Sequence, residues 1–356
     1  MILGPVHRDA LPLNGVPFER GKAQANHADR DKVTSAIELR LQQNAAIFSN
    51  PTVQDYLGRQ WEFASEHCCE EVEELNGIAD GFDMEAKRLF EFLHLGIVKN
   101  LNMPIVGEDG CSTWAVSQLA QGPVVGKNRD FMGEHATLQA VFEHQDPSWE
   151  SGRRILCIGS MGSPGAYSSG INSDGLTVVD THISTSDYGV GWLRYFLMTR
   201  LLTHHSNVAS AVNYIKSVPH AGGGSLILSD PTGRVAAVDL GHNSISVVER
   251  RNGWVARTNH FEEGSVSNHD DGAPMQGSTM GRRKALTKAL TAKDKTLTSL
   301  TQLMQTHTND EIEGLCRHGE DGDARTLSSA IFLCESRTVF FSDGNPCTTG
   351  WEEYSL

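Results

Sequence analysis

The chain has 356 residues, of which 39% are hydrophobic, so it is long enough to bury a large core. Its 44 acidic and 30 basic residues give a formal net charge of −14, and no basic stripe interrupts this excess, which argues against nucleic-acid binding. The seven cysteines form no CxxC pair, so the sequence does not support a zinc ribbon or a thioredoxin-like motif and favours free thiols in a reducing compartment.

The first residues of the chain carry no signal-peptide pattern, and no apolar run approaches the ~18 residues of a membrane span. These features predict a soluble, cytoplasmic protein without a membrane partner. A length prior of about 150 residues per domain favours two domains, although α/β folds often run longer as one.

The first hundred residues have the apolar periodicity of helices. We expect helices over 33–45, 53–75 and 84–101. Gly77 and Gly81 punctuate this region, and Pro104 and Gly107 end the last helix. Charges between the apolar positions form a solvated face.

After residue 111, short apolar runs alternate with turn residues, which is typical of strands. Hairpins are expected for 114–116 with 123–126, for 225–230 with 235–239, and for 328–334 with 338–342. Further strands are expected over 154–159, 175–179, 245–249 and 254–257, and helices over 195–202, 208–215, 281–290 and 297–305. Such an order fits a layered protein with mainly antiparallel sheets. The segment 262–278, rich in Gly, Ser, Asn and Asp, predicts a mobile loop.

Cys111 follows Gly110 where the helical pattern gives way to strands. If the Gly110–Cys111 bond breaks, Cys111 becomes an N-terminus that carries a thiol nucleophile and an α-amine base on one residue. Glycine suits the scissile position because it accepts a strained backbone at low steric cost. The alternative interpretation of Cys111 is a buried, inert packing thiol.

Six short motifs favour the catalytic interpretation. They are 74–81 (ELNGIADG), 109–113 (DGCST), 126–131 (GKNRDF), 170–176 (GINSDGL), 257–261 (RTNHF) and 344–347 (GNPC). Their order and spacing resemble the cysteine N-terminal nucleophile (Ntn) hydrolases of the acyl-coenzyme A:6-aminopenicillanic-acid acyltransferase family, relatives of the choloylglycine hydrolases. The resemblance implies an α+β fold, a four-layer αββα sandwich. It also implies a zymogen that cleaves itself into a helical propiece, residues 1–110, and a catalytic core, residues 111–356.

The resemblance also assigns roles to single residues. It places Asp130 near Cys111, where a carboxylate binds the α-amine or orients the thiolate. Alternation along a strand puts Asn128 and Asp130 on one face and Arg129 on the other. Asn259 is expected to donate its amide N–H to the tetrahedral oxyanion.

Three further residues are expected to donate to the oxyanion or to support the site. Asn172 lies in a turn bracketed by glycines and is a second donor candidate, with an ordinary turn residue as the alternative. Asn128 is likewise expected to donate to the oxyanion or to support the site. His260 is expected to pack beside the site, because the α-amine of Cys111 already supplies a base.

Four cations lie close to these motifs in sequence: Lys127, Arg129, Arg282 and Arg283. A local positive field in an acidic protein attracts a carboxylate. We therefore expect these residues to bind the substrate, an amide or lactam with a carboxylate near the scissile bond. The alternative is that they face solvent and pair with nearby acids.

The predicted reaction is hydrolysis of a small-molecule amide through an acyl-enzyme on Cys111. Transfer of an acyl group from a thioester to an amine, and an unprocessed Ntn-fold binding protein, are the alternatives left open. No cofactor and no metal site is predicted. The neighbouring residues His67, Cys68 and Cys69 are set aside as ligands because adjacent helical residues point about 100° apart, and His204 and His205 are set aside for the same reason. Homo-oligomer formation is left open.

Overall fold

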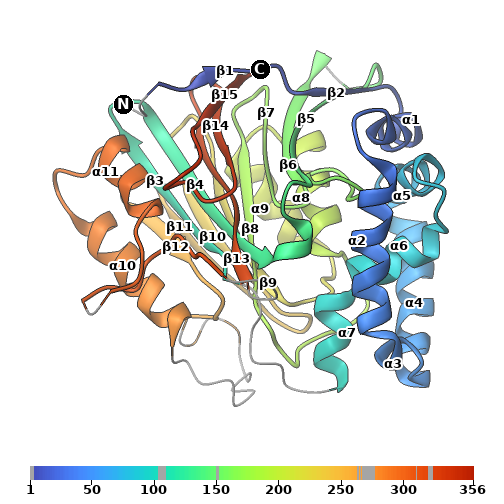
Figure 1. Cartoon of the computed structure of the whole chain (residues 1–356). Helices are drawn as coiled ribbons and strands as arrows, with labels where there is room; N and C mark the ends of the chain where they lie inside the picture. The colour runs from blue at the N-terminus through green and yellow to red at the C-terminus, as the bar shows by residue number, and fades with distance from the viewer. Residues whose placement is uncertain are drawn as a thin grey trace.

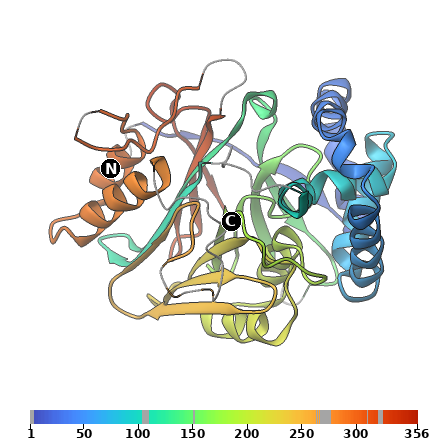
Figure 2. The same ribbon diagram turned by 90° about the horizontal axis from the view of Figure 1, so that it is seen from below.

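The computed structural model describes residues 4–102, 110–149, 152–262, 264, 266, 277–309, 311–319 and 324–356. Two β-sheets lie face to face, with helices on the outer face of each (Figures 1 and 2). This arrangement confirms the predicted α+β class. Within the described ranges, no helix is long and apolar enough to cross a membrane.

The first sheet has the strand order β1-β15-β14-β13-β4-β3-β12. Its strands are β1 (Val6–His7), β3 (Ser112–Leu119), β4 (Gly122–Met132), β12 (Trp254–Arg257), β13 (Ala324–Leu333), β14 (Thr338–Asp343) and β15 (Glu352–Ser355). The predicted hairpins at β3–β4 and β13–β14 are confirmed as antiparallel pairs.

The second sheet has the order β11-β10-β9-β8-β7-β6-β5-β2. Its strands are β2 (Leu11–Asn14), β5 (Gln139–Gln145), β6 (Arg154–Ser160), β7 (Ser169–Asn172), β8 (Thr177–His182), β9 (Gly224–Ser229), β10 (Val235–Leu240) and β11 (Ile245–Arg250). The predicted β9–β10 hairpin is confirmed. Neighbouring strands run antiparallel, except that β1–β15 and β2–β5 are parallel pairs.

Helices cover the outer face of each sheet (Figure 1). The helices α10 (Ser278–Thr291) and α11 (Leu297–Met304) lie on the first sheet. The helices on the side of the second sheet are α1 (Pro17–Ala23), α2 (Arg30–Gln43), α3 (Ala45–Phe48), α4 (Pro51–His67), α5 (Cys69–Gly81), α6 (Ala86–Leu93), α7 (Leu95–Asn102), α8 (Arg194–His204) and α9 (Val208–Ser217). A short 3₁₀ turn follows α1 at Gln24–Asn26 (η1), and another follows β4 at Gly133–His135 (η2).

Three apolar clusters fill the spaces between these four layers. Trp114 of β3 packs with Leu286 of α10 in the outer cluster. Val125 of β4 and Ile227 of β9 meet between the sheets, and Phe196 of α8 belongs to the cluster behind the second sheet. Each central strand therefore buries both faces, so that alternate residues of β4 point into different layers.

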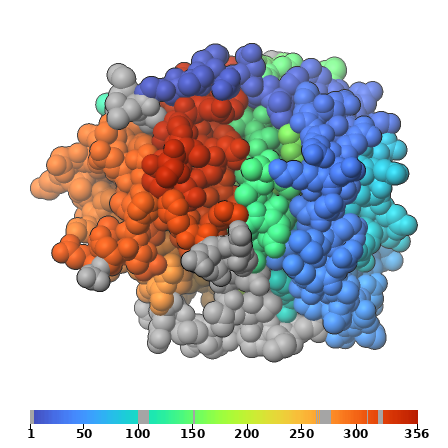
Figure 3. Space-filling model, viewed as in Figure 1, coloured from blue at the N-terminus to red at the C-terminus, as the bar shows by residue number. Residues whose placement is uncertain are grey.

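The N-terminal region is helical as predicted, but two short strands precede the helices. In α2, Val33, Ile37 and Leu41 are buried on one face. Before the helices, however, β1 and β2 add an edge strand to each sheet. Figure 3 shows this N-terminal segment in dark blue, crossing the molecule beside the C-terminal strands in red. The short, partly exposed strands lacked the length needed to stand out as a sequence pattern.

Gly81 is the last residue of α5 and marks a helix end as predicted, whereas Gly77 lies inside α5 and does not interrupt the chain. A Cβ on Gly77 would clash with the carbonyl oxygen of Phe18, and one on Gly21 would clash with that of Glu74. Close packing of α1 on α5, and not a turn, requires glycine here. The predicted helix over 84–101 is divided at His94 into α6 and α7. Pro104, Gly107 and most of the predicted loop at 262–278 lie outside the described residues.

Candidate active site

Cys111 lies at the end of the first sheet, directly before β3. It is 7% exposed. Antiparallel pairing places Thr113 of β3 opposite Arg257 of β12. The hydroxyl oxygens of Thr113 and Thr181 lie 2.8 Å apart and join β3 to β8 in the second sheet. The ends of strands from both sheets therefore meet around Cys111.

Gly110 is enclosed by two charged groups. A Cβ at this position would lie 2.6 Å from Oδ2 of Asp130 and would clash with the guanidinium of Arg317. Asp130 is buried on β4, and its Oδ1 accepts a hydrogen bond of 2.6 Å from the hydroxyl of Thr326. Gly110 is not among the glycines of positive φ in the described part of the chain. Close contact with the side chains of Asp130 and Arg317 therefore favours glycine before Cys111.

Arg282 connects Cys111 with Asn259. Its guanidinium is buried in α10. Nη1 donates to the Cys111 carbonyl oxygen at 2.6 Å and to Oγ of Ser112 at 3.0 Å. Nη2 donates to Oδ1 of Asn259 at 3.0 Å. Burial lowers the pKa of Arg282, and the charge of Asp130 opposes this effect.

The side-chain amide of Asn259 is held at both ends. Its oxygen accepts from Arg282, and its Nδ2 donates to the carbonyl oxygen of His182 at 2.9 Å. His182 is the last residue of β8. An amide nitrogen carries two hydrogens, and the His182 contact uses one. The second N–H is therefore held in a fixed orientation beside the start of β3.

His260 lies next to Asn259 but bonds away from Cys111. Its Nδ1 is 2.9 Å from the hydroxyl oxygen of Thr279 and 3.2 Å from that of Thr258. Burial lowers the pKa of His260, which favours a neutral ring. These contacts agree with a packing role beside the site.

The cations predicted to bind substrate separate into different environments. Of the four, Arg282 contacts Cys111. Nε of Arg283 lies 2.5 Å from Oε1 of Glu262, and its guanidinium carbon lies 5.5 Å from the ring centre of Trp254. Arg283 is thus held by its own neighbours at the side of α10.

Lys127 and Arg129 point from β4 toward the second sheet. Nζ of Lys127 donates to the Ser168 carbonyl oxygen at 3.0 Å and pairs with Asp180. Arg129 donates to Gln139 and, at 3.0 Å, to Oγ of Ser160. Both side chains are buried between the sheets. The structure does not bring them together with Arg282 and Arg283.

Asp180 pairs with a second cation, which the sequence analysis did not identify. Nε of Arg194 lies 2.7 Å from Oδ2 of Asp180. Burial acts to raise the pKa of Asp180, but Lys127 and Arg194 outweigh it and lower the pKa. Burial acts to lower the pKa of Arg194, and interactions that include Cys111 raise it. Arg194 therefore lies within electrostatic reach of the Cys111 thiol.

Asn128 lies on the same face of β4 as Asp130, as alternation predicts. Its Nδ2 donates to the carbonyl oxygens of Met304 at 2.9 Å and Leu315 at 2.8 Å. Its Oδ1 accepts from Ser329 at 2.9 Å. These bonds fasten the end of α11 and the following segment to the first sheet.

Asn172 is distant from Cys111. Ile171, the residue before Asn172, pairs with Thr177 at the start of β8. Thr113, two residues after Cys111, contacts Thr181 near the end of β8. Five strand steps separate the two ends, about 16 Å. The Asn172 amide donates to Leu202 and His205 carbonyl oxygens, and its Oδ1 accepts from the backbone of the following turn. These contacts match the turn-residue alternative.

Sequence reasoning missed the cations Arg194 and Arg317 and also a group of possible metal ligands. Although the sequence predicts no metal site, the described residues contain four side chains whose ligand atoms lie within 4.8 Å of one another: His307, Cys316, His318 and Cys347. The signals available in the sequence were the short run 316–318 (CRH) and the closing GNPC motif. These segments are far apart in sequence, so their meeting was not predictable from spacing.

Two sheets between helical layers, with a cysteine that follows a glycine directly before a strand, are features of the Ntn-hydrolase class. A family model described as acyl-coenzyme A:6-aminopenicillanic acid acyl-transferase matches residues 118–347, which is more than half of the 356 residues. The chain belongs to this family, which confirms the resemblance seen in the motifs. The matched region begins after Cys111 and contains Asp130, Asn259 and Arg282.

Solved structures include similar proteins of low sequence identity. The conjugated bile acid hydrolase from Clostridium perfringens, in two variant forms, is 12% identical over 69% of this chain and 97% of that chain, with TM-scores of 0.46 and 0.47. Penicillin V acylase from Agrobacterium tumefaciens is 12% identical over 65% of this chain and 83% of that chain, with a TM-score of 0.42. The search of curated proteins gives no match.

Proposed function

We propose that the chain is a self-processing cysteine hydrolase that cleaves a small-molecule amide bond. The observation that carries this proposal is the enclosure of the Gly110–Cys111 bond by Asp130, with Arg282 joining Cys111 to Asn259. Residues 1–110 are then the propiece, and residues 111–356 are the catalytic core.

Self-processing begins with attack of the Cys111 sulfur on the Gly110 carbonyl carbon. The Gly110–Cys111 C–N bond breaks as a thioester forms, and the Cys111 nitrogen gains a proton to become an amine. The Asp130 carboxylate, which lies beside Gly110, accepts the thiol proton. Water then hydrolyses the thioester, which frees the Gly110 carboxylate and the Cys111 thiol.

After cleavage, the new α-ammonium of Cys111 lies beside the Asp130 carboxylate, which stabilises it. The guanidiniums of Arg282 and Arg194 act electrostatically on Cys111 and favour its thiolate. The thiolate attacks the substrate carbonyl, and the second N–H of Asn259 donates to the oxyanion. The α-amine gives its proton to the leaving amine, and water releases the acyl group.

The contacts between the two segments support a propiece that stays bound after cleavage. Strands β1 and β2 pair with β15 and β5 of the core. Arg20 lies 2.6 Å from Asp146 in a buried ion pair, and Arg200 lies 2.8 Å from Glu71 in a part-buried one, so ion pairs also cross the division. Breaking one backbone bond leaves these contacts in place.

The family description favours a second candidate, transfer of the acyl group to an amine. Both reactions share the acyl-enzyme on Cys111 and differ only in the acceptor. Adding a small amine to a turnover assay distinguishes them, because a transferase forms the new amide in preference to the free acid. A screen of N-acyl amino acids, β-alanyl amines, β-lactams and lactones supplies the donor.

Mass spectrometry of the denatured full-length protein tests self-processing. We expect two fragments, 1–110 and 111–356, in the wild-type protein and one intact chain in Cys111→Ala. Cys69→Ala, which changes an exposed thiol in the propiece, is the matched control and should be cleaved normally. A wild-type protein that hydrolyses amides while it remains one chain would contradict the proposal. An intact chain that binds amides without turnover would support the binding-protein alternative.

A further inference from the structure

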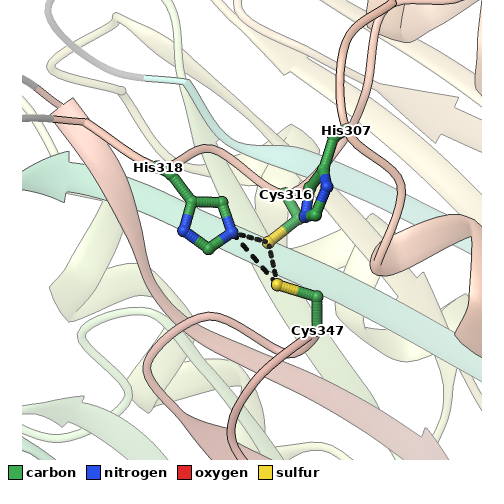
Figure 4. A group of neighbouring side chains, drawn as sticks. All are labelled: His307, Cys316, His318 and Cys347. Atoms are coloured by element: carbon green, nitrogen blue, oxygen red, sulfur yellow. Dashed lines mark hydrogen bonds between the residues drawn. The ribbon is translucent and has the colours of Figure 1, made fainter.

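We propose that His307, Cys316, His318 and Cys347 bind a zinc ion. Figure 4 shows the four side chains pointing toward one another, Cys316 and His318 from one segment and the other two from separate segments. The Cys316 and Cys347 sulfurs are 3.5 Å apart. Nε2 of His318 is 3.0 Å from the Cys347 sulfur and 3.7 Å from the Cys316 sulfur.

These distances fit a tetrahedral site of two cysteines and two histidines. Bonds of about 2.3 Å to sulfur place two sulfurs about 3.8 Å apart in a tetrahedron, and a sulfur and a nitrogen slightly closer. The observed separations need only small movements of side chains to reach these values. The His307 ring supplies the fourth corner, because it meets the His318 ring edge to face with centroids 4.9 Å apart.

The donor set selects the metal. Thiolate sulfur and imidazole nitrogen suit zinc, whereas magnesium and calcium take oxygen ligands. Two thiolates also neutralise the charge of Zn²⁺. A disulfide requires sulfurs about 2.05 Å apart, which is much closer than the 3.5 Å between Cys316 and Cys347.

Hydrogen bonds from neighbouring residues hold the ligand segments in place. The Cys316 N–H donates to the Thr306 carbonyl oxygen at 2.9 Å. A Cβ on Gly314 would clash with the backbone of His307, so glycine lets these two segments lie side by side. Nδ2 of Asn345 lies 3.4 Å from the Cys316 sulfur as a donor. A donor to a ligating sulfur is typical of the groups that orient metal ligands.

The site is connected to the candidate active site through Arg317. This residue stands between two ligands, and its guanidinium lies beside Gly110. Its backbone N–H donates to Oγ1 of Thr326 at 2.9 Å, and Thr326 donates to Asp130 at 2.6 Å. A zinc ion would therefore fix the segment that positions Arg317. This positioning role rests on the proposed function, whereas zinc binding itself does not.

Metal analysis of the untagged full-length protein tests the site. The protein is purified from cells grown with added zinc and is then washed with a chelator. We expect about one zinc per chain, as in closed structural sites. Cys316→Ser and His318→Ala should each lose the metal. Cys69→Ser and His67→Ala change an exposed cysteine and an exposed histidine elsewhere and should retain it. Wild-type protein that holds no zinc after supplementation would overturn the proposal, as would a Cys316–Cys347 disulfide in freshly isolated protein.

A second measurement keeps the test valid if the variants fail to fold. Wild-type protein reconstituted with Co²⁺ should show the strong visible and thiolate charge-transfer bands of tetrahedral sulfur ligation. Weak bands without thiolate absorption would overturn the ligand assignment. Zinc bound by an uncleaved and inactive chain would contradict the proposed function alone, so the two failures are distinguishable.

Discussion

The two faces of β4 carry polar residues with different tasks. Asp130 and Asn128 face the side of α10 and α11, where Asp130 reaches Gly110. Lys127 and Arg129 face the second sheet and bond to it. All four are neighbours in one sequence motif, yet only one face reaches the Gly110–Cys111 bond. Proximity in sequence therefore overstates how many cations of a motif are available to a substrate.

Buried ion pairs on the inner face of the first sheet, which includes β4, join the two sheets. Lys127 and Arg194 share Asp180, and Arg257 of β12 pairs with Asp239 of β10 at 2.7 Å. Buried ion pairs repay little of their desolvation cost, but removal of one partner leaves an unbalanced charge. The inner face should therefore govern stability, and the outer face should govern chemistry.

The largest expected effect is that of Asp130→Asn. The variant keeps the size of the side chain and can still accept from Thr326, but it loses the charge beside Gly110. Self-cleavage should slow by about 10²–10⁴-fold, the usual contribution of a positioned base. Gel analysis of cleavage over time measures this. Cleavage at the wild-type rate would show that the charge of Asp130 on the outer face does not promote self-cleavage.

Asn259→Ala tests the donor that Arg282 and His182 orient. We expect a folded protein whose kcat falls by about 10²–10³-fold, or about 2.7–4 kcal/mol. His260→Ala should cost much less, because its ring bonds to Thr258 and Thr279. Loss of the chemical step in the histidine variant, with processing intact, would instead indicate a Cys–His dyad.

Lys127→Met tests the inner face. Asp180 keeps Arg194 in this variant, so the loss should be smaller than the 3–5 kcal/mol typical of a buried charge left alone; we expect about 1–3 kcal/mol in urea unfolding. Turnover of the folded fraction should change little. A large loss of kcat without a loss of stability would place Lys127 in the chemistry and remove the contrast between the faces.

The division between the faces shows what sequence could and could not predict. Alternation predicted the opposite orientations of Asp130 and Arg129 because the strand period is fixed at two residues. Turn residues predicted the hairpins for the same local reason. Gly77 was misinterpreted because its requirement comes from α1, which is distant in sequence. Arg317 and the zinc ligands depend on loops that meet only after folding.

A pH-dependent prediction concerns His135, which lies close to the inner cation Arg129. Burial, with smaller effects of Arg129 and Arg40, lowers its pKa to about 3. Below about pH 6.5 the unfolded chain binds a proton that the folded chain does not, so stability falls as pH falls toward 3. His135→Gln should reduce this slope by about 1.4 kcal/mol per pH unit between those values. Urea titrations at pH 7 and 5.5 measure the change, and an unaltered slope would contradict it.

Arg283→Ala should have the smallest effect. Its guanidinium is already paired with Glu262 and lies over Trp254, and partly exposed pairs contribute about 0–1 kcal/mol. Of the four cations predicted to bind a substrate carboxylate, Arg282 is the one that contacts Cys111. Comparing a free-acid substrate with its methyl ester should therefore give the same preference in Arg283→Ala as in the wild type. Loss of that preference in Arg283→Ala would mean that Glu262 releases Arg283 to the substrate, and the expected contrast between these adjacent arginines would fail.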